Sequence, residues 1–188
     1  MKNEELKLNN TISIITKFPT KKQIAEFLDH NNRIEGEHEV EQLEDAMTAW
    51  EYLENQDDIT IQGILKTHKI LMLRCPLQPN ERGYFREAPV TISGRLGVDH
   101  NKISKAMNQW VLNVNDLVQN GQNEHLDCLE RIIKIHHVAY EKIHPFIDGN
   151  GRTGRMFMNW ERIKLGLPIV IIHEGKEQES YYHWFKEN

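Results

Sequence analysis

Apolar side chains recur every three or four residues along most of this chain, and this period restricts the fold more than any other feature of the sequence. Leu43, Ala46 and Trp50, for example, would lie on one face of an α-helix. Such spacing is typical of amphipathic helices that pack against a shared core. Helices are therefore predicted over Ile24–Leu28, Glu37–Asn55, Ile59–Leu73, Asn101–Val118, Leu126–Ile143, Arg152–Leu165 and Lys176–Lys186. The predicted fold class is all-α.

One region breaks the helical period. Residues 76–83 are rich in turn formers, and a short β-branched run, residues 90–92, then lies between Pro89 and Gly94. This pattern predicts a small β-hairpin, or flap, attached to the helical domain. Residues 1–20 are polar and are predicted to form an amino-terminal arm. Residues 21–188 are predicted to form a single domain, because no linker long enough to separate two domains interrupts them.

The composition excludes several classes of protein. Among 188 residues, 23 Lys and Arg stand against 28 Asp and Glu, a net charge of −5, whereas a general nucleic-acid binder usually carries a basic patch. No apolar run approaches the ~18 residues of a membrane span, and the first residues lack the basic-then-apolar order of a secretion signal. Cys75 and Cys128 form no metal-type pair. We therefore expect a reduced, cytoplasmic protein without nucleic-acid or membrane partners.

The residues from 144 to 155 contain a backbone pattern that is typical of an anion site. Pro145 disfavours helix at the residue before it, so the preceding helix is predicted to end at Ile143. The run Gly149–Gly151 permits backbone conformations that other residues avoid, and a new helix is predicted directly after it. A glycine-rich turn that leads into a helix points unsatisfied N–H groups and the positive end of the helix dipole toward a bound anion.

The side chains of the same stretch suit a nucleotide. Arg152 and Arg155 are three residues apart, so they share a helix face, and their guanidinium groups match the outer phosphates of a nucleotide. Asp148 offers the hard oxygen ligand that a phosphate-bound Mg²⁺ needs. His144 is the side chain in this loop that can accept a proton near neutral pH. Together these residues predict phosphoryl-type transfer.

The run from His144 to Arg155 resembles, without a gap, the signature His-Pro-Phe-x-Asp/Glu-Gly-Asn-Gly-Arg-x-x-Arg of the Fic family. The resemblance implies a Fic-type helical domain with a small β-hairpin flap. It also implies a protein adenylyltransferase, which transfers AMP from ATP to a protein hydroxyl and releases pyrophosphate. The implied cofactor is Mg²⁺. The implied partners are ATP and a protein that presents a Ser, Thr or Tyr hydroxyl, this chain itself included.

The resemblance also implies roles for individual residues. His144 would take the proton of the target hydroxyl, and Asp148 would hold Mg²⁺ against the α- and β-phosphates. Arg152 would hold the β-phosphate and Arg155 the γ-phosphate. The further nucleotide-binding residues would be Gly149, Asn150, Gly151, Thr153, Gly154, Tyr181 and Tyr182. The residues that clamp an extended stretch of the target by strand addition would be Val90, Thr91, Ile92 and Ser93.

A second resemblance lies before the first long helix. The run from Asn31 to Gly36 is similar to the Fic inhibitory motif Ser/Thr-x-x-x-Glu-Gly/Asn, with Asn31 in place of Ser or Thr. The resemblance implies that Glu35 pairs with Arg155 and blocks productive ATP binding, as in the class with an amino-terminal inhibitory helix. The domain would then restrain its own activity.

Other interpretations of the same residues stay open at this point. Fic relatives can transfer phosphate or phosphocholine, or remove AMP with a water aligned by the inhibitory Glu, and a module that only binds nucleotide is a further alternative. Glu35 could be a plain partner of a helix dipole, and the two tyrosines at 181 and 182 plain core aromatics. His136 and His137 are expected in a buried polar network rather than at zinc. The sequence does not indicate the target protein or the oligomeric state.

Overall fold

The computed structural model describes residues 18–92 and 94–186, and within them the chain is mostly helical. The helices are α1 (Lys21–Arg33), α2 (Val40–Glu54), α3 (Ile61–Leu71), α4 (Ile103–Asn120), α5 (Leu126–Ile143), α6 (Asn150–Lys164) and α7 (Lys176–His183), with short 3₁₀ turns η1 (His100–Lys102) and η2 (Gly121–Asn123). The strands are β1 (Thr91–Ile92) and β2 (Arg95–Leu96). The predicted all-α class with a small hairpin is confirmed.

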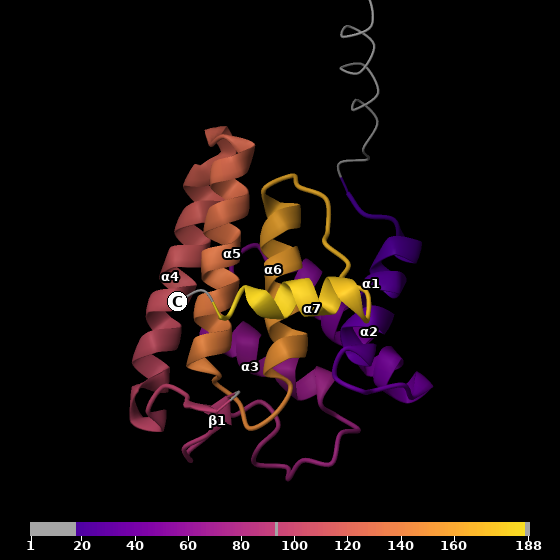
Figure 1. Cartoon of the computed structure of the whole chain (residues 1–188), viewed down its shortest axis with the longest axis vertical. Helices are drawn as coiled ribbons and strands as arrows, with labels where there is room; N and C mark the ends of the chain where they lie inside the picture. Colours follow the sequence, from indigo (N-terminus) through magenta and orange to yellow (C-terminus); the bar gives the residue numbers. More distant parts are fainter. Residues whose placement is uncertain (1–17, 93, 187–188) are drawn as a thin grey trace, which may run out of the picture.

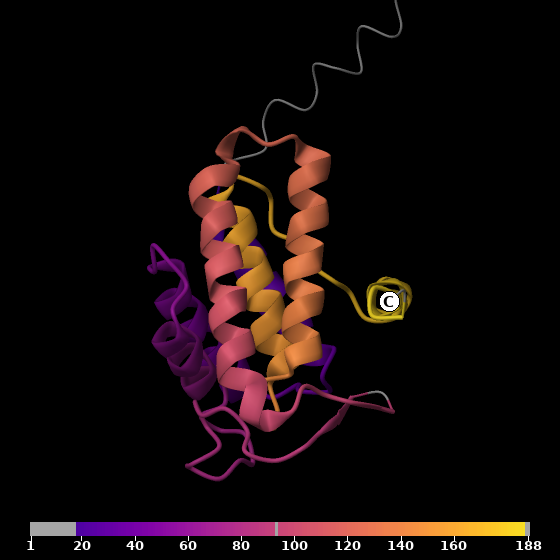
Figure 2. The same ribbon diagram turned by 90° about the vertical axis from the view of Figure 1, so that its left-hand side faces the viewer.

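Helix α6 is the centre of the fold. Helices α4 and α5 run beside it on one side, α1, α2 and α3 cover the other side, and α7 crosses the bundle separately (Figures 1 and 2). Nearly every side chain of α6 is buried, including the large Phe157 and Trp160, which join Trp50 of α2 and Tyr140 of α5 in the main core. At the start of α6, Asn150 is buried and Gly151 half-buried, whereas Asp148 just before the helix is exposed.

The predicted helix limits are close to the observed ones, with one exception. Leu126–Ile143 is the observed extent of α5, whereas α1 runs from Lys21 to Arg33 and is much longer than the predicted Ile24–Leu28. Thr20 caps α1, since its side chain accepts from the Gln23 N–H at 3.3 Å and its own N–H donates to Gln23 Oε1 at 2.9 Å. The second half of α1 buries Asn31 and Asn32, and these polar residues end the apolar pattern before the helix ends.

The predicted arm and flap are described only in part. Of the arm, residues 1–17 lie outside the described residues, and Thr20 belongs to the cap of α1. In the flap, β1 and β2 pair antiparallel, with Thr91 opposite Leu96, and the Gly97 N–H extends the pairing to the Val90 carbonyl at 3.0 Å. Ser93 also lies outside the described residues. The flap lies at the same end of the bundle as the turn between α5 and α6 (Figure 1).

Among the described residues, no helix combines the length and the apolar character that crossing a membrane requires.

Candidate active site

The turn between α5 and α6 begins with a residue whose backbone conformation is strained. His144 ends α5 in the left-handed conformation, with φ 50° and ψ 63°, and its N–H donates to the Tyr140 carbonyl at 3.0 Å. It is the one residue other than glycine with a positive φ among residues 18–92 and 94–186. Such backbone costs an ordinary residue about 1–3 kcal/mol and is found mostly at functional sites. This left-handed backbone ends α5 and turns the chain away from the helix axis at His144.

Asn150 closes the turn from its other side. Its side chain is buried, accepts from the Phe146 N–H at 2.8 Å and donates to the Phe146 carbonyl at 2.9 Å. The predicted nucleotide contact from Asn150 therefore has its backbone N–H as donor, because the side-chain amide is already used to hold the loop.

The start of α6 has the backbone geometry on which the predicted anion site depends. Gly149 has φ 76°, which only glycine adopts readily, and α6 begins at the next residue, two positions earlier than predicted. The first N–H groups of the helix have no acceptor within it. A Cβ added at Gly151 would overlap Oε1 of Glu35, so the Glu35 carboxylate lies directly against this first turn. Binding of a nucleotide by these groups stays a prediction.

Arg155 is buried and fully paired. Its Nε donates to Asn31 Oδ1 at 2.6 Å, and its Nη2 donates to Glu35 Oε1 at 2.7 Å and to the Asn31 carbonyl at 3.1 Å. Its Nη1 lies 3.4 Å from the Tyr181 hydroxyl. Burial alone would lower the pKa of Arg155, but Tyr181 and Glu35 raise it above its ordinary value. Asn31, which replaces the family's Ser or Thr, supplies two of the acceptors. We call this set of contacts the latch.

Arg152 is equally buried but poorly paired. Its Nη2 lies 3.7 Å from Asp148 Oδ2 and 3.8 Å from Glu37 Oε1, and its Nη1 lies 3.6 Å from the sulfur of Cys75. Its Nε has no hydrogen-bond partner among the described residues. A buried guanidinium group with spare donors is a receptor for an additional anion.

Two further side chains of the signature, those of Asp148 and His144, belong to the loop before α6. The Asp148 side chain is 55% exposed; its Oδ1 accepts from the Gly149 N–H at 2.6 Å, while Oδ2 makes no hydrogen bond within the described residues. Burial lowers the pKa of His144, partly opposed by the backbone carbonyl of Glu141. The imidazole is therefore neutral near pH 7 and can accept a proton.

The remaining signature residues serve the contact between α5 and α6. Thr153 is fully buried, and its hydroxyl bonds Tyr140 at 2.8 Å and the Gly149 carbonyl at 2.8 Å. A Cβ at Gly154 would overlap Glu141 Oε1 and stand 3.0 Å from the Tyr140 ring. Nucleotide contact by these two residues stays a prediction.

The two tyrosines of α7 differ from each other. Tyr181 is buried, and its hydroxyl lies 2.9 Å from His137 Nε2 as well as beside Arg155, whereas Tyr182 is 40% exposed. Burial lowers the pKa of His137 to about 3, so this histidine is neutral. His136 bonds Glu161 at 2.7 Å. The expected polar network of the two histidines is thus present.

Arg86 is a site residue that no sequence pattern indicated. It is buried; its Nε donates to the His144 carbonyl at 2.7 Å, and Nη1 and Nη2 donate to the carbonyls of Ala88 and Val98, at the base of the flap. Its backbone N–H donates to the Pro145 carbonyl at 2.9 Å. One side chain therefore joins the end of α5, the loop between α5 and α6, and the flap.

His68 is a second residue that only the structure reveals. Its Nδ1 accepts from the Gly83 N–H at 2.9 Å, so its proton is on Nε2, which donates to the Asp148 carbonyl at 3.0 Å. Its ring stacks on Phe146 with centroids 3.7 Å apart, and burial lowers its pKa to about 4. A neutral, buried imidazole of α3 thus holds the loop through the Asp148 carbonyl.

The chain is similar to known proteins in sequence. Residues 58–161 match the family described as Fic/DOC. "Protein adenylyltransferase Fic" of Drosophila erecta is 33% identical over 131 residues, which are 69% of this chain and 24% of that relative. The protein of the same name from Drosophila melanogaster is 32% identical over 131 residues, 69% of this chain and 25% of that relative. The chain spans about a quarter of the length of these curated relatives.

Solved structures show the same fold. A Fic domain containing signaling protein from Bacteroides thetaiotaomicron VPI-5482 aligns with a TM-score of 0.69 and 20% identity, over 88% of this chain and 70% of that one. Residues 134–508 of Fic-1 from C. elegans align with a TM-score of 0.66 and 20% identity, over 89% of this chain and 55% of that one.

Proposed function

Because the chain belongs to the Fic/DOC family, we propose that it is a protein adenylyltransferase, which transfers AMP from MgATP to a Ser, Thr or Tyr hydroxyl of a protein. The observation that carries the proposal is the combination found at the start of α6. A neutral imidazole at His144 lies on the same short loop as a helix amino terminus, and the buried Arg152 and Arg155 follow in the first turns of that helix. This arrangement suits attack on a phosphorus atom beside a bound triphosphate.

The reaction proceeds by displacement at the α-phosphorus. The target hydroxyl oxygen forms the new bond to the α-phosphorus, and its proton passes to His144 Nε2, since Nδ1 is buried. The bond from the α-phosphorus to the oxygen that bridges it to the β-phosphate breaks, and pyrophosphate leaves with the electron pair. Positioning and charge stabilisation supply most of the rate in such reactions. Arg152 holds the β-phosphate, and the amide groups at the start of α6 hold the neighbouring oxygens.

The metal of the reaction would bind at Asp148. Its half-exposed carboxylate has an oxygen without a hydrogen bond within the described residues, and a carboxylate oxygen beside phosphates is the usual protein ligand of Mg²⁺. When bound, the ion would neutralise the charge that builds up on the leaving pyrophosphate. His68, which fixes the Asp148 carbonyl, holds this carboxylate in place.

We assign the inhibitory role to Glu35. Its carboxylate accepts a hydrogen bond from Nη2 of Arg155 and lies against Gly151, where phosphate oxygens would otherwise be held. ATP can place its γ-phosphate on Arg155 only when Glu35 leaves. The competition is between two anions for one buried cation, and the chain's own carboxylate has the advantage of being covalently attached.

The flap is proposed to receive the target. Residues 90–92 and 95–96 form a two-stranded ribbon at the same end of the bundle as His144, and Arg86 links the base of this ribbon to the His144 carbonyl. An extended peptide that pairs with the exposed edge of the ribbon would bring its hydroxyl toward the imidazole.

Labelling with ATP that carries radioactive phosphorus in the α-position tests the transfer. In the Glu35→Gly background, the purified protein should become labelled, or should label a lysate protein. His144→Ala should lower the rate by about 10²–10⁴-fold, the usual contribution of a general base. His125→Ala, which removes the exposed imidazole of the N-cap residue at the other end of α5, serves as the matched control and should leave the rate unchanged.

Three outcomes contradict the proposal. Labelling that survives His144→Ala would show that this imidazole is not the base. Tight ATP binding without labelling in the Glu35→Gly variant would show a nucleotide-binding module in place of an enzyme. A modified protein whose mass increases by phosphate or phosphocholine, in place of AMP, would show a different transferase on the same scaffold.

A further inference from the structure

The segment that includes α7 packs on the inhibitory segment from outside the bundle. We call residues 172–186 the α7 strap. Its Ile172 and Tyr181 form a small buried cluster with Ile34, the residue before Glu35. Gln178 of the strap also donates to the Ile34 carbonyl at 3.3 Å. The position of the inhibitory carboxylate therefore depends on how α1 and the strap are held together.

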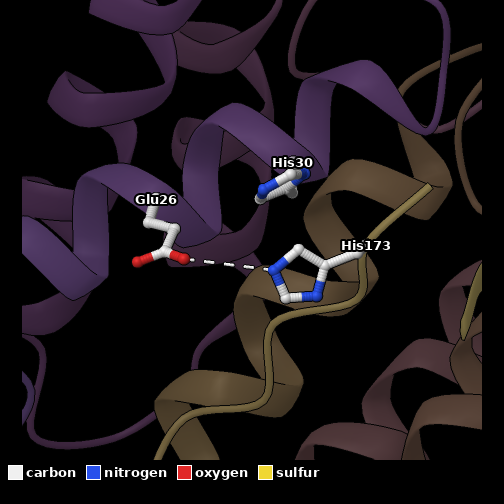
Figure 3. Close-up of side chains that lie close together, drawn as sticks. All are labelled: Glu26, His30 and His173. Carbon is white, nitrogen blue, oxygen red and sulfur yellow. Dashed lines mark ion pairs between the residues drawn. The ribbon is translucent and has the colours of Figure 1, made fainter.

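Three potential metal ligands meet at this contact. Glu26 and His30 are one turn apart on the same face of α1, and His173 comes from the strap (Figure 3). One donor atom of each residue lies within 4.8 Å of the others. His173 Nε2 is 3.9 Å from Glu26 Oε1, and the two imidazole rings are 4.4 Å apart between centroids. Residues 143 positions apart in the chain thus converge on one point.

Carboxylates fix the other nitrogen of each imidazole. His30 Nδ1 lies 3.2 Å from Glu174 Oε2, and His173 Nδ1 lies 2.7 Å from Glu177 Oε2. The Glu177 carboxylate also accepts the backbone N–H of His173 at 3.0 Å. A carboxylate on the second nitrogen is the arrangement that most metal-binding histidines have, because it sets the tautomer and leaves Nε2 for the metal. The pattern is present on both histidines.

From this geometry we propose that Glu26, His30 and His173 bind a divalent transition-metal ion of the zinc class, which ties α1 to the α7 strap. Two imidazole nitrogens and one carboxylate oxygen form an accepted donor set for Zn²⁺, with water as the fourth ligand. Mg²⁺ and Ca²⁺ take oxygen ligands and are disfavoured here, so this site is chemically distinct from the one proposed at Asp148.

The charges around the cluster favour a dication. With neutral imidazoles, three carboxylates surround the two histidines, those of Glu26, Glu174 and Glu177. The side chains are between 23% and 61% exposed, so they are free to move from separations of up to 4.8 Å to the shorter separations of a metal site. A bound ion would hold the half of α1 that leads into Asn31 and Glu35. The ion would therefore strengthen the latch, an effect that rests on the proposed function.

Metal titration tests the site without any measurement of activity. Protein stripped with a chelator is titrated with ZnCl₂ in competition with a chromophoric chelator, and binding of one ion for each chain is expected. His30→Gln and His173→Gln should each weaken Zn²⁺ binding by at least 10–100-fold, and Glu177→Gln by about tenfold. His125→Gln, an exposed histidine away from the cluster, should leave the affinity unchanged.

The visible spectrum of bound Co²⁺ identifies the ligands. Absorption bands of a four-coordinate nitrogen and oxygen site are expected, and they should disappear in His173→Gln. A thiolate charge-transfer band would place the ion at a cysteine and overturn the assignment. An affinity that is equal in wild type, His30→Gln and His173→Gln would overturn it as well.

The effect on the latch is tested separately. Zn²⁺ at its site should lower self-labelling of the wild-type chain by severalfold, and this decrease should be absent in His173→Gln, which keeps the proposed Mg²⁺ site at Asp148. An equal decrease in both proteins would overturn the coupling to the latch. If no variant transfers AMP, the proposed function fails, while the titration still decides whether the metal site exists.

Discussion

Two regions flank the amino terminus of α6, and they are held in different ways. The loop from His144 to Gly149 is fixed by the interior of the protein, through Arg86, His68 and the buried amide of Asn150. The proposed inhibitory segment, residues 31–36, is anchored by the buried Ile34 and by the contacts of Asn31, whereas the carboxylate of Glu35 is 35% exposed and bonds one cation, Arg155. The loop is held by buried contacts throughout, whereas the Glu35 carboxylate could leave Arg155 without disturbing the core.

The difference indicates what regulation would change under the proposed function. The His144 imidazole, the first turn of α6 and Arg152 are in place while Glu35 contacts Arg155, so activation as proposed would need no rearrangement of the loop. Because a buried guanidinium group without a partner costs free energy, Arg155 would exchange one anion for another, Glu35 for a phosphate. The exchange can be tested from the loop side and from the latch side.

The largest effect is expected from breaking the loop side. Arg86→Met removes the donors that hold the carbonyls of His144, Ala88 and Val98 and keeps the aliphatic stem. In the Glu35→Gly background, kcat for AMP transfer should fall by about 100-fold, because a misplacement of about 1 Å has this effect on an oriented reaction. The KM for ATP should change little, since Arg86 bonds none of the residues predicted to hold the phosphates. Steady-state labelling measures both.

Arg131→Met, an exposed arginine of α5, is the matched control for this prediction. Arg86→Lys keeps one donor and should give an intermediate kcat, which keeps the test decisive if Arg86→Met does not fold. A kcat within threefold of the background in both variants would contradict the role of Arg86 in positioning the loop.

A smaller effect of opposite sign is expected from opening the latch. Glu35→Gly should raise self-labelling by about tenfold, a typical coupling between two competing ligands. Asn31→Ser, which installs the residue of the family motif, keeps an acceptor for Arg155 and should change labelling much less. ATP affinity, measured by equilibrium binding, should rise with the labelling rate in Glu35→Gly.

An unchanged rate in Glu35→Gly would show that the contact between Glu35 and Arg155 is a structural ion pair only. A larger increase from Asn31→Ser than from Glu35→Gly would assign the restraint to the Arg155 contacts of Asn31. Either result would reverse the contrast between a fixed loop and a releasable latch.

The smallest effect concerns a carboxyl group behind both regions. Glu141 of α5 has a buried Oε1 without a hydrogen-bond partner among the described residues, and burial raises its pKa to about 7, with Glu35 adding to the rise and Arg155 opposing it. A carboxyl group whose pKa is raised in the folded state stabilises the fold least when it is ionised. Its contribution is therefore lost as the pH rises from about 4.5 to about 7.

Glu141→Gln should therefore raise Tm at pH 8 by about 2–4 °C relative to wild type, with little difference at pH 5. Thermal unfolding followed by circular dichroism at both pH values measures this. In the Glu35→Gly background the loss of stability should be smaller and should end at lower pH, because one of the negative charges that raise the pKa of Glu141 is gone. A Tm difference that does not depend on pH would contradict a buried, titrating Glu141.

The loop between α5 and α6 was predictable because the residues that identify it are contiguous in the sequence. Twelve residues, from 144 to 155, contain a helix stop, three glycines and three charged side chains, and the structure brings them together around one turn. The latch was predictable from the resemblance of residues 31–36 alone, and the contact between Glu35 and Arg155 is present. The period of the apolar residues did not indicate this contact.

The supports of the loop could not be predicted in the same way. Arg86 and His68 bond mainly to backbone carbonyls that lie 58 and 80 residues away in the chain, and a backbone carbonyl leaves no mark on the sequence. The full length of α1 was missed because Asn31 and Asn32 are buried for their hydrogen-bonding position and interrupt the apolar period. The packing of α7 on Ile34 depends on tertiary structure alone.

The left-handed backbone at His144 has a consequence for the evolution of the domain. Glycine and asparagine adopt this conformation with less strain than histidine does, so replacing the imidazole there costs the fold little or nothing. Catalytic capacity and foldability are therefore uncoupled at this position. Copies of the domain that have lost the proposed reaction should accumulate as well-folded, chemically inert proteins, and they would still carry the two buried arginines of α6 and residues 31–36.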